Sequence, residues 1–109
     1  MWLFCKMGFF SAVEHFENKE LIHVRARFEG DLERLCEQHG VKAEVMQTPG
    51  NDYPYRMDFS RKTWAEIVVK EAENIDYTNF KNAVHDNTPR DFAYMQCWSA
   101  LRRNQSSPV

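Results

Sequence analysis

The feature that most constrains the fold is the segment LIHVRARFEG, residues 21–30, in which apolar and polar residues alternate. Its apolar parity holds Ile22, Val24, Ala26 and Phe28, and its polar parity holds His23, Arg25 and Arg27. A period of two is typical of a strand with one face in the core. We therefore expect two arginines and a histidine side by side on the face that does not enter the core.

Length and composition predict one globular domain over residues 1–104, with a flexible tail over 105–109. The chain has 109 residues, of which 43% are hydrophobic and 28% charged. A formal charge of −2 argues against a general nucleic-acid or membrane coat but permits a local basic patch. With neither a signal-like start nor an apolar run of about 18 residues, the sequence predicts a cytoplasmic protein that does not bind membranes.

The remaining periodicity predicts three further strands and several helices. The strands are expected over Trp2–Val13 with a bulge at Gly8, over Val41–Met46, and over Tyr53–Phe59 with an irregular start at Pro54. A helix is expected from its N-cap Asp31 to Gly40, and another from its N-cap Ser60 to near Asn74.

Two more helical segments are expected near the C-terminus. One has Asp76 as N-cap, and its buried side is formed by Phe80, Ala83 and Val84. The other has Pro89 in its first turn and an apolar stripe of Tyr94, Cys97, Trp98 and Leu101. The order β-β-α-β-β-α-α predicts an α+β domain, a four-stranded and mostly antiparallel sheet with helices packed on one face.

The polar parity of the strands is the first candidate site. Arg25, Arg27 and Arg56 could grip a phosphate or carboxylate, since a guanidinium presents a planar fork of donors. Alternatively, Glu44 and Asp58 neutralise the arginines across the strands of a solvated face. The strand aromatics are expected on the core parity, which weakens a sheet-face RNA site in particular.

Two turns supply further candidates. In NDYPYR, the side chains of Asp52, Tyr53 and Arg56 could meet a ligand at the rim of the sheet, or they serve turn formation and packing. In IDYTNFKN, Asp76, Asn79 and Lys81 could add polar contacts, or they initiate a helix.

Cofactor, metal and nucleophile signals are weak. Cys36 and His39 stand three apart on a helix, but a structural zinc site needs four ligands and no second pair has suitable spacing. Cys5, Cys36 and Cys97 each have apolar neighbours, so they are expected to be reduced core thiols. We expect no metal and no cofactor. General acid–base work by Asp52 or Asp76 with His23 or His85 stays open.

Five motifs, WLFCKMGFFS, VRARFEGDLERL, DYPYR, IDYTNFKNAV and YMQCWSALRR, span about residues 2 to 105. In this combination the chain resembles a family of small uncharacterised bacterial proteins that begin Trp-x-Phe. Those proteins similarly carry an Arg-Ala-Arg strand, an Asp-Tyr-x-x-Arg turn and a Tyr-x-Asn-Phe-Lys helix start. The resemblance brings no activity with it. Some relatives carry a histidine where this chain has Arg90 or Asp91, so a role for that histidine does not transfer.

These observations favour a small non-enzymatic binding or regulatory module, with an anionic small molecule or an acidic protein surface on the Arg25, Arg27 and Arg56 face. The alternative is a nucleic-acid-binding protein that uses the same face, for example as a homodimer. A third class is an enzyme acting on a nucleotide or phosphoester. Composition also permits an accessory factor of a mobile element that acts by occupying a host complex.

Overall fold

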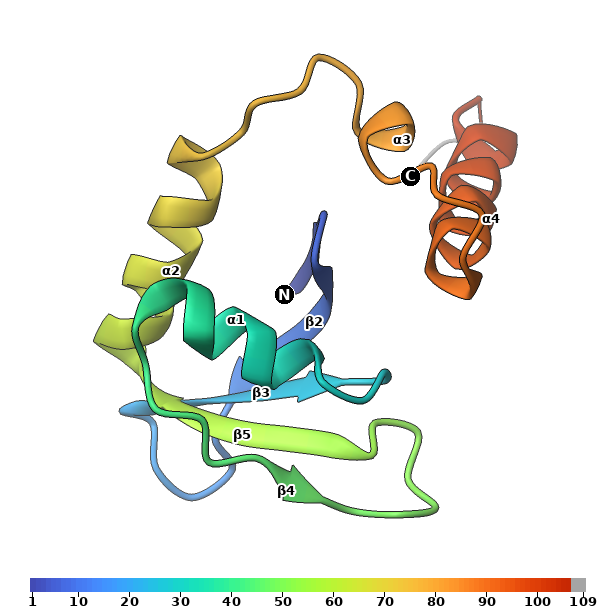
Figure 1. Ribbon diagram of the computed structural model, residues 1–109. Coiled ribbons are helices and arrows are strands. Elements are labelled where there is room, and N and C mark those ends of the chain that lie inside the picture. Colours follow the sequence, from blue (N-terminus) through green and yellow to red (C-terminus); the bar gives the residue numbers. More distant parts are fainter. Residues whose placement is uncertain (107–109) are drawn as a thin grey trace. The chain divides into compact units, whose positions relative to one another are not determined.

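A five-stranded antiparallel sheet organises the N-terminal part of this α+β protein. In the computed structural model, which describes residues 1–106, the strands pair in the order β1-β2-β3-β5-β4 (Figure 1). Their bounds are β1 Trp2–Cys5, β2 Gly8–Glu14, β3 Leu21–Ala26, β4 Met46–Gln47 and β5 Tyr55–Ser60. All four strand pairs are antiparallel. The expectation of four strands is therefore wrong in number.

The additional strand comes from the first apolar run. Cys5 pairs with Gly8, so the chain reverses through Lys6 and Met7 instead of continuing as one bulged strand to Val13. Apolar residues run almost without a break through this hairpin, and hydrophobic periodicity alone could not reveal the turn. Only Gly8 marked the position.

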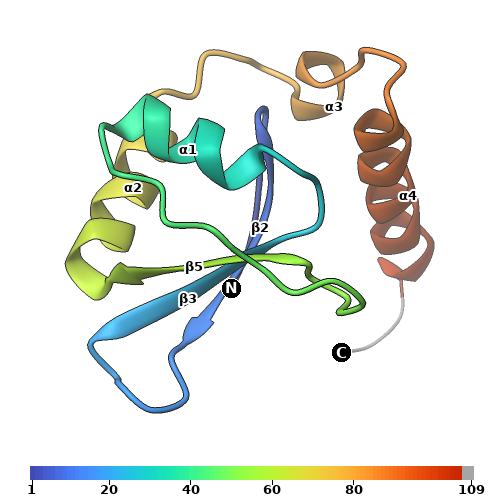
Figure 2. The same cartoon turned by 60° about the horizontal axis from the view of Figure 1, so that its bottom comes forward.

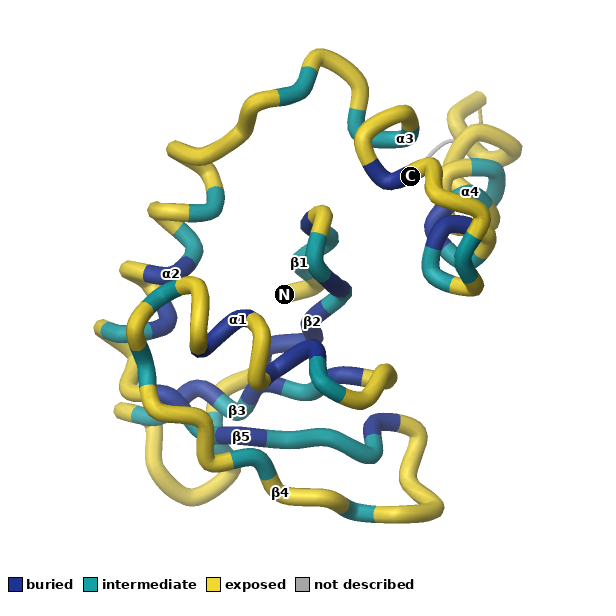
Figure 3. The backbone as a smooth tube through the Cα atoms, viewed as in Figure 1, coloured by how far each residue is buried: buried dark blue, intermediate teal, exposed yellow. Residues whose placement is uncertain are grey.

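The predicted third strand is mostly wrong as well. Residues 41–45 form no strand, and β4 holds only Met46 and Gln47, which pair with Arg56 and Tyr55. Figure 3 shows the chain around β4 as largely exposed. Lys42 and Glu44, the polar residues of this alternation, are exposed and do not belong to a strand.

The buried face of the sheet follows the predicted parity of β3. Ile22, Val24 and Ala26 are buried there, and the helices α1 (Asp31–His39) and α2 (Arg61–Glu73) lie over this same face (Figures 1 and 2). The helices complete the core with Leu32, Leu35, Cys36, Trp64 and Ile67. The predicted strand at Tyr53 begins two residues later, at Tyr55, because Pro54 cannot join the ladder.

Helix ends agree with the sequence at three of four positions in this part of the chain. Gly40 ends α1 with a left-handed φ of 67°, and the Ser60 hydroxyl accepts the Thr63 N–H at 3.0 Å at the start of α2, which ends with Asn74 as its C-cap. Asp31 is not the N-cap of α1: Gly30 holds that position with a φ of 88°. Asp31 is instead the first helical residue, paired with Arg34.

Within residues 1–106, internal contacts form two compact units, which divide between Ile75 and Asp76. The second unit holds α3 (Phe80–Ala83) and α4 (Pro89–Asn104). Asn79, and not Asp76, caps α3, and of its expected buried side only Val84 is buried. Pro89 opens α4 as predicted.

The apolar stripe predicted for α4 is only partly correct. Tyr94 is buried and stacks on Phe80 with ring centroids 5.8 Å apart, whereas Cys97, Trp98 and Leu101 are exposed. Of the tail predicted over 105–109, residues 107–109 lie outside the described part of the chain. None of the helices within residues 1–106 is long and apolar enough to cross a membrane.

Two apolar residues of α2 provide a matched test of this packing. Ile67 is 1% exposed in the core, while Val69 is 54% exposed on the same helix. Ile67→Ala should lower the free energy of unfolding by about 2–5 kcal/mol, because it leaves a cavity. Val69→Ala should change it by less than about 0.5 kcal/mol. Urea unfolding followed by circular dichroism measures both, and equal losses would contradict the placement of α2.

Candidate functional site

A row of side chains crosses all five strands on the face opposite α1 and α2. Strand register pairs Trp2 with Ser11, Ser11 with Arg25, Arg25 with Arg56, and Arg56 with Met46. Directly paired residues of antiparallel strands share a face. The sheet therefore carries two adjacent arginines at the centre of the face opposite the core, which confirms the polar parity expected for Arg25. We refer to the residues of this row, together with Arg27, as the arginine row.

The Tyr53 ring contacts the guanidinium groups of both Arg25 and Arg27. Its ring lies 4.6 Å from Cζ of Arg25 and 4.1 Å from Cζ of Arg27, measured to the ring centroid. These are cation–π distances. The sequence had grouped Tyr53 with the core residues of its strand, but its ring, 4% exposed, is buried against the arginines.

The three arginines donate to uncharged oxygens. Arg25 donates through Nη2 to the Ser11 hydroxyl at 2.8 Å, and Arg27 through Nη1 to the Asp52 carbonyl at 2.7 Å. Arg56 donates through Nε to the Tyr53 carbonyl at 3.0 Å. Nε of Arg25 is buried and has no hydrogen-bond partner within residues 1–106.

The two carboxylates expected to neutralise these arginines are paired with other side chains. Glu44 pairs with Lys42 at 3.7 Å, and Asp58 pairs with His23 at 2.7 Å. In the described chain, the one carboxylate paired with the row is that of Asp52, 3.9 Å from Arg56. Three guanidinium groups thus face a single, largely exposed carboxylate.

Beside the arginine row lies a histidine–aspartate cluster. Nδ1 of His23 is 2.7 Å from Oδ1 of Asp58, and Nε2 of His15 is 3.7 Å from Oδ2 of the same carboxylate. His15 Nδ1 accepts the backbone N–H groups of Glu17 and Asn18, so a neutral His15 carries its proton on Nε2. Asp58 is therefore hydrogen-bonded to His23 and lies within ion-pair distance of His15.

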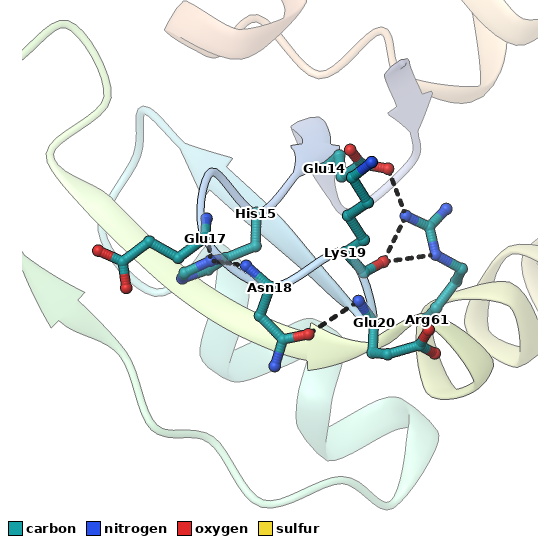
Figure 4. A network of polar contacts seen from close by, with 7 residues as sticks. All are labelled: Glu14, His15, Glu17, Asn18, Lys19, Glu20 and Arg61. Atoms are coloured by element: carbon teal, nitrogen blue, oxygen red, sulfur yellow. Dashed lines mark hydrogen bonds and ion pairs between the residues drawn. The ribbon is translucent and has the colours of Figure 1, made fainter.

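The loop that carries His15 is fixed to the start of α2 (Figure 4). Arg61 donates to the Lys19 carbonyl through Nε at 3.0 Å and Nη2 at 2.7 Å, and Nη2 also lies 3.0 Å from the Glu14 carboxylate. The Asn18 side chain accepts the Glu20 N–H at 3.0 Å within the same loop. The His15 position is thus set by a network of local and long-range hydrogen bonds.

The other candidate residues belong to the second unit. Asn79 accepts the Asn82 N–H at 3.0 Å, which is the helix-initiating role. Nζ of Lys81 lies 3.6 Å from the Trp98 ring centroid. Asp76 is the first residue of this unit.

Both histidines considered for acid–base work have an aspartate partner. His23 pairs with Asp58, and His85 pairs with Asp91, with Nδ1 2.9 Å from Oδ2. Asp52, one of the two carboxylates considered with these histidines, lies 3.9 Å from Arg56.

Two further titratable groups, Asp86 and Cys36, have pKa values shifted from their ordinary ones. A hydrogen bond from Thr88 is the main cause that lowers the pKa of Asp86, just before α4. Burial, with a smaller contribution from Glu33, raises the pKa of the Cys36 thiol. Residues 1–106 contain no group of three or more His, Cys, Asp or Glu side chains arranged to hold a metal ion.

Sequence reasoning missed two contributors to the arginine row. Ser11 is the one hydroxyl in the apolar run of β2, which was the available signal. Trp2 was assigned to the core with the other strand aromatics, but Trp2, Phe4 and Phe9 lie on the arginine face. Their parity could not be read while β1 and β2 were taken as one strand.

No protein family model matches the chain, and no curated protein or solved structure matches it significantly.

The three cysteines give a direct test of this environment. Cys5 and Cys36 are buried, while Cys97 is exposed on α4, contrary to the expectation of three core thiols. The raised pKa of Cys36 leaves it protonated at neutral pH and burial blocks access, so iodoacetamide at pH 7.5 should label Cys97 alone. Peptide mass spectrometry should find all three labelled in denaturant, and labelling of Cys36 in the native protein would contradict its placement.

Proposed function

We propose that this protein is a non-enzymatic binding module that takes an anionic ligand, of the phosphate or carboxylate class, on Arg25, Arg27 and Arg56. The observation that carries the proposal is the imbalance of charge around Tyr53. Three guanidinium groups gather there with one carboxylate, although the chain as a whole has a net charge of −2.

The pairing of Arg25 with Arg56 adds to this argument. Like charges directly opposite on neighbouring strands are destabilising. Here each arginine is turned toward a neutral oxygen, Arg25 to Ser11 and Arg56 to the Tyr53 carbonyl. A bound anion between them would replace the repulsion with two attractive contacts.

The remaining donors suit such an anion. A guanidinium has five N–H groups, and each arginine of the row uses only part of them on protein oxygens. Charge-assisted hydrogen bonds from arginine to phosphate or carboxylate are roughly twice as strong as neutral ones. The row can therefore bind an anion without giving up its present contacts.

The geometry also limits the entropy cost of binding. Stacking on Tyr53 holds the guanidiniums of Arg25 and Arg27, while strand pairing fixes the backbone of Arg25 and Arg56. Side chains that are already ordered lose little rotamer freedom when a ligand arrives. An acidic protein surface presents the same carboxylate chemistry, so the test includes both kinds of anion.

The test compares two arginine substitutions with a control arginine. Inorganic phosphate and an oligoglutamate peptide are titrated at low salt into the full chain, and backbone amide shifts are followed by NMR. We expect shifts centred on β3 and the Tyr53 loop, and at least tenfold weaker binding in the double variant Arg25→Gln, Arg27→Gln. The control Arg61→Gln alters an arginine of the Glu14 and Lys19 network and should bind as the unsubstituted chain does.

Stability provides the second readout. Each cation–π contact of the pair is worth about 0.5–1 kcal/mol, so the double variant should stay folded with a modestly lower melting temperature. Unchanged phosphate and peptide binding in the folded double variant, or no localised shifts in the unsubstituted chain, would refute the proposal. Binding of the peptide alone would identify an acidic protein surface as the ligand.

A further inference from the structure

An exposed tryptophan occupies one end of the arginine row. Trp2 is 68% exposed on β1 and is the register partner of Ser11, the residue that receives the Arg25 hydrogen bond. Its ring meets Phe9 edge to face, with centroids 5.7 Å apart and an angle of 84° between the planes. Phe9 in turn packs on Phe4 at 4.6 Å. Trp2 is therefore supported from below and open to solvent.

The positive charge and the tryptophan lie within reach of one small ligand. Nη2 of Arg25 reaches the Ser11 hydroxyl on β2, and β1 is the next strand, about 4.8 Å further across the sheet. A buried aromatic side chain contributes to packing. A largely exposed tryptophan near guanidinium groups can instead serve as a stacking surface for a ligand. Any nucleobase can stack on such a ring, because every nucleobase has a π-face.

We infer that the anion bound by this face is a nucleotide unit, whose phosphate contacts Arg25 and Arg56 and whose base stacks on Trp2. This inference rests on the proposed function, because it assigns the phosphate to the same arginines. It adds the chemical class of the ligand, a phosphate joined through one sugar to a planar base.

A second exposed aromatic distinguishes a free nucleotide from a strand. Phe16 is 88% exposed and stacks on His15 with centroids 5.0 Å apart. His15 faces Asp58 on the arginine side of the sheet, beyond the row that contains Trp2. A mononucleotide on Arg25 and Trp2 leaves Phe16 unused, whereas a single strand can contact both rings.

The charge of the chain sets the expected salt dependence. Each phosphate neutralised on a single strand contributes about −0.7 to the slope of log affinity against log salt. Three arginines give a slope near −2 at most, since the net charge of −2 supplies no wider basic track. A much steeper slope would indicate a different surface.

The experiment measures calorimetric affinities of ribose 5-phosphate, adenosine 5′-monophosphate and a single-stranded oligoribonucleotide for the full chain. The monophosphate should bind at least tenfold more tightly than ribose 5-phosphate, because only it has a base to stack. Trp2→Leu should remove that gain and leave ribose 5-phosphate unaffected, while Trp2→Phe should keep most of it. The matched control Trp98→Leu changes a tryptophan that is 44% exposed in the second unit and should bind normally.

Phe16→Leu decides between the two forms of the ligand. A loss confined to the oligoribonucleotide indicates a strand, and no loss for any ligand indicates a free nucleotide. Equal binding of ribose 5-phosphate and the monophosphate overturns the inference and leaves the proposed function intact. Equal loss of both in Trp2→Leu also overturns it, since Trp2 is then structural. Failure of all three ligands to bind counts against the proposed function itself.

Discussion

Backbone pairing of β3 on both of its edges is the constraint on which the rest of the structure depends. Val24 pairs with Ala12 on one side and Met57 on the other, and the next residue, Arg25, pairs with Ser11 and Arg56. Successive residues point to opposite faces, so the same ladder that seals the core aligns the arginine row. A slip of one residue would exchange the two faces, burying charge and exposing Val24.

How much could be predicted from sequence follows from which interactions are local. The parity of β3, the Ser60 cap and the Gly40 terminus depend on neighbouring residues and were predicted correctly. The division of the first run into β1 and β2 depends on a turn that carries no turn-type residue before Gly8. The placement of Trp2 was lost with it, because parity is meaningful only within one strand.

The ion pairs of the candidate site were also only partly predictable from the sequence. Sequence identified the arginines and Tyr53, and in one of two alternatives it paired the arginines with Glu44 and Asp58, two carboxylates of suitable parity. Asp58 is instead occupied by His23 and His15, and the loop that positions His15 is held by Arg61. Which carboxylate neutralises which cation depends on loop geometry that residue spacing does not report.

The hydrogen bonds of Arg61 have a consequence for the order of folding. They join positions 42 and 47 apart in the chain, while the hairpin of β2 and β3 closes over a short loop. Contacts between distant positions require the greater loss of chain entropy before they contribute, so the hairpin can form ahead of them. The loop bearing His15 and Phe16 then reaches its final conformation only when α2 has docked, which makes it one of the last parts of this face to become rigid during folding.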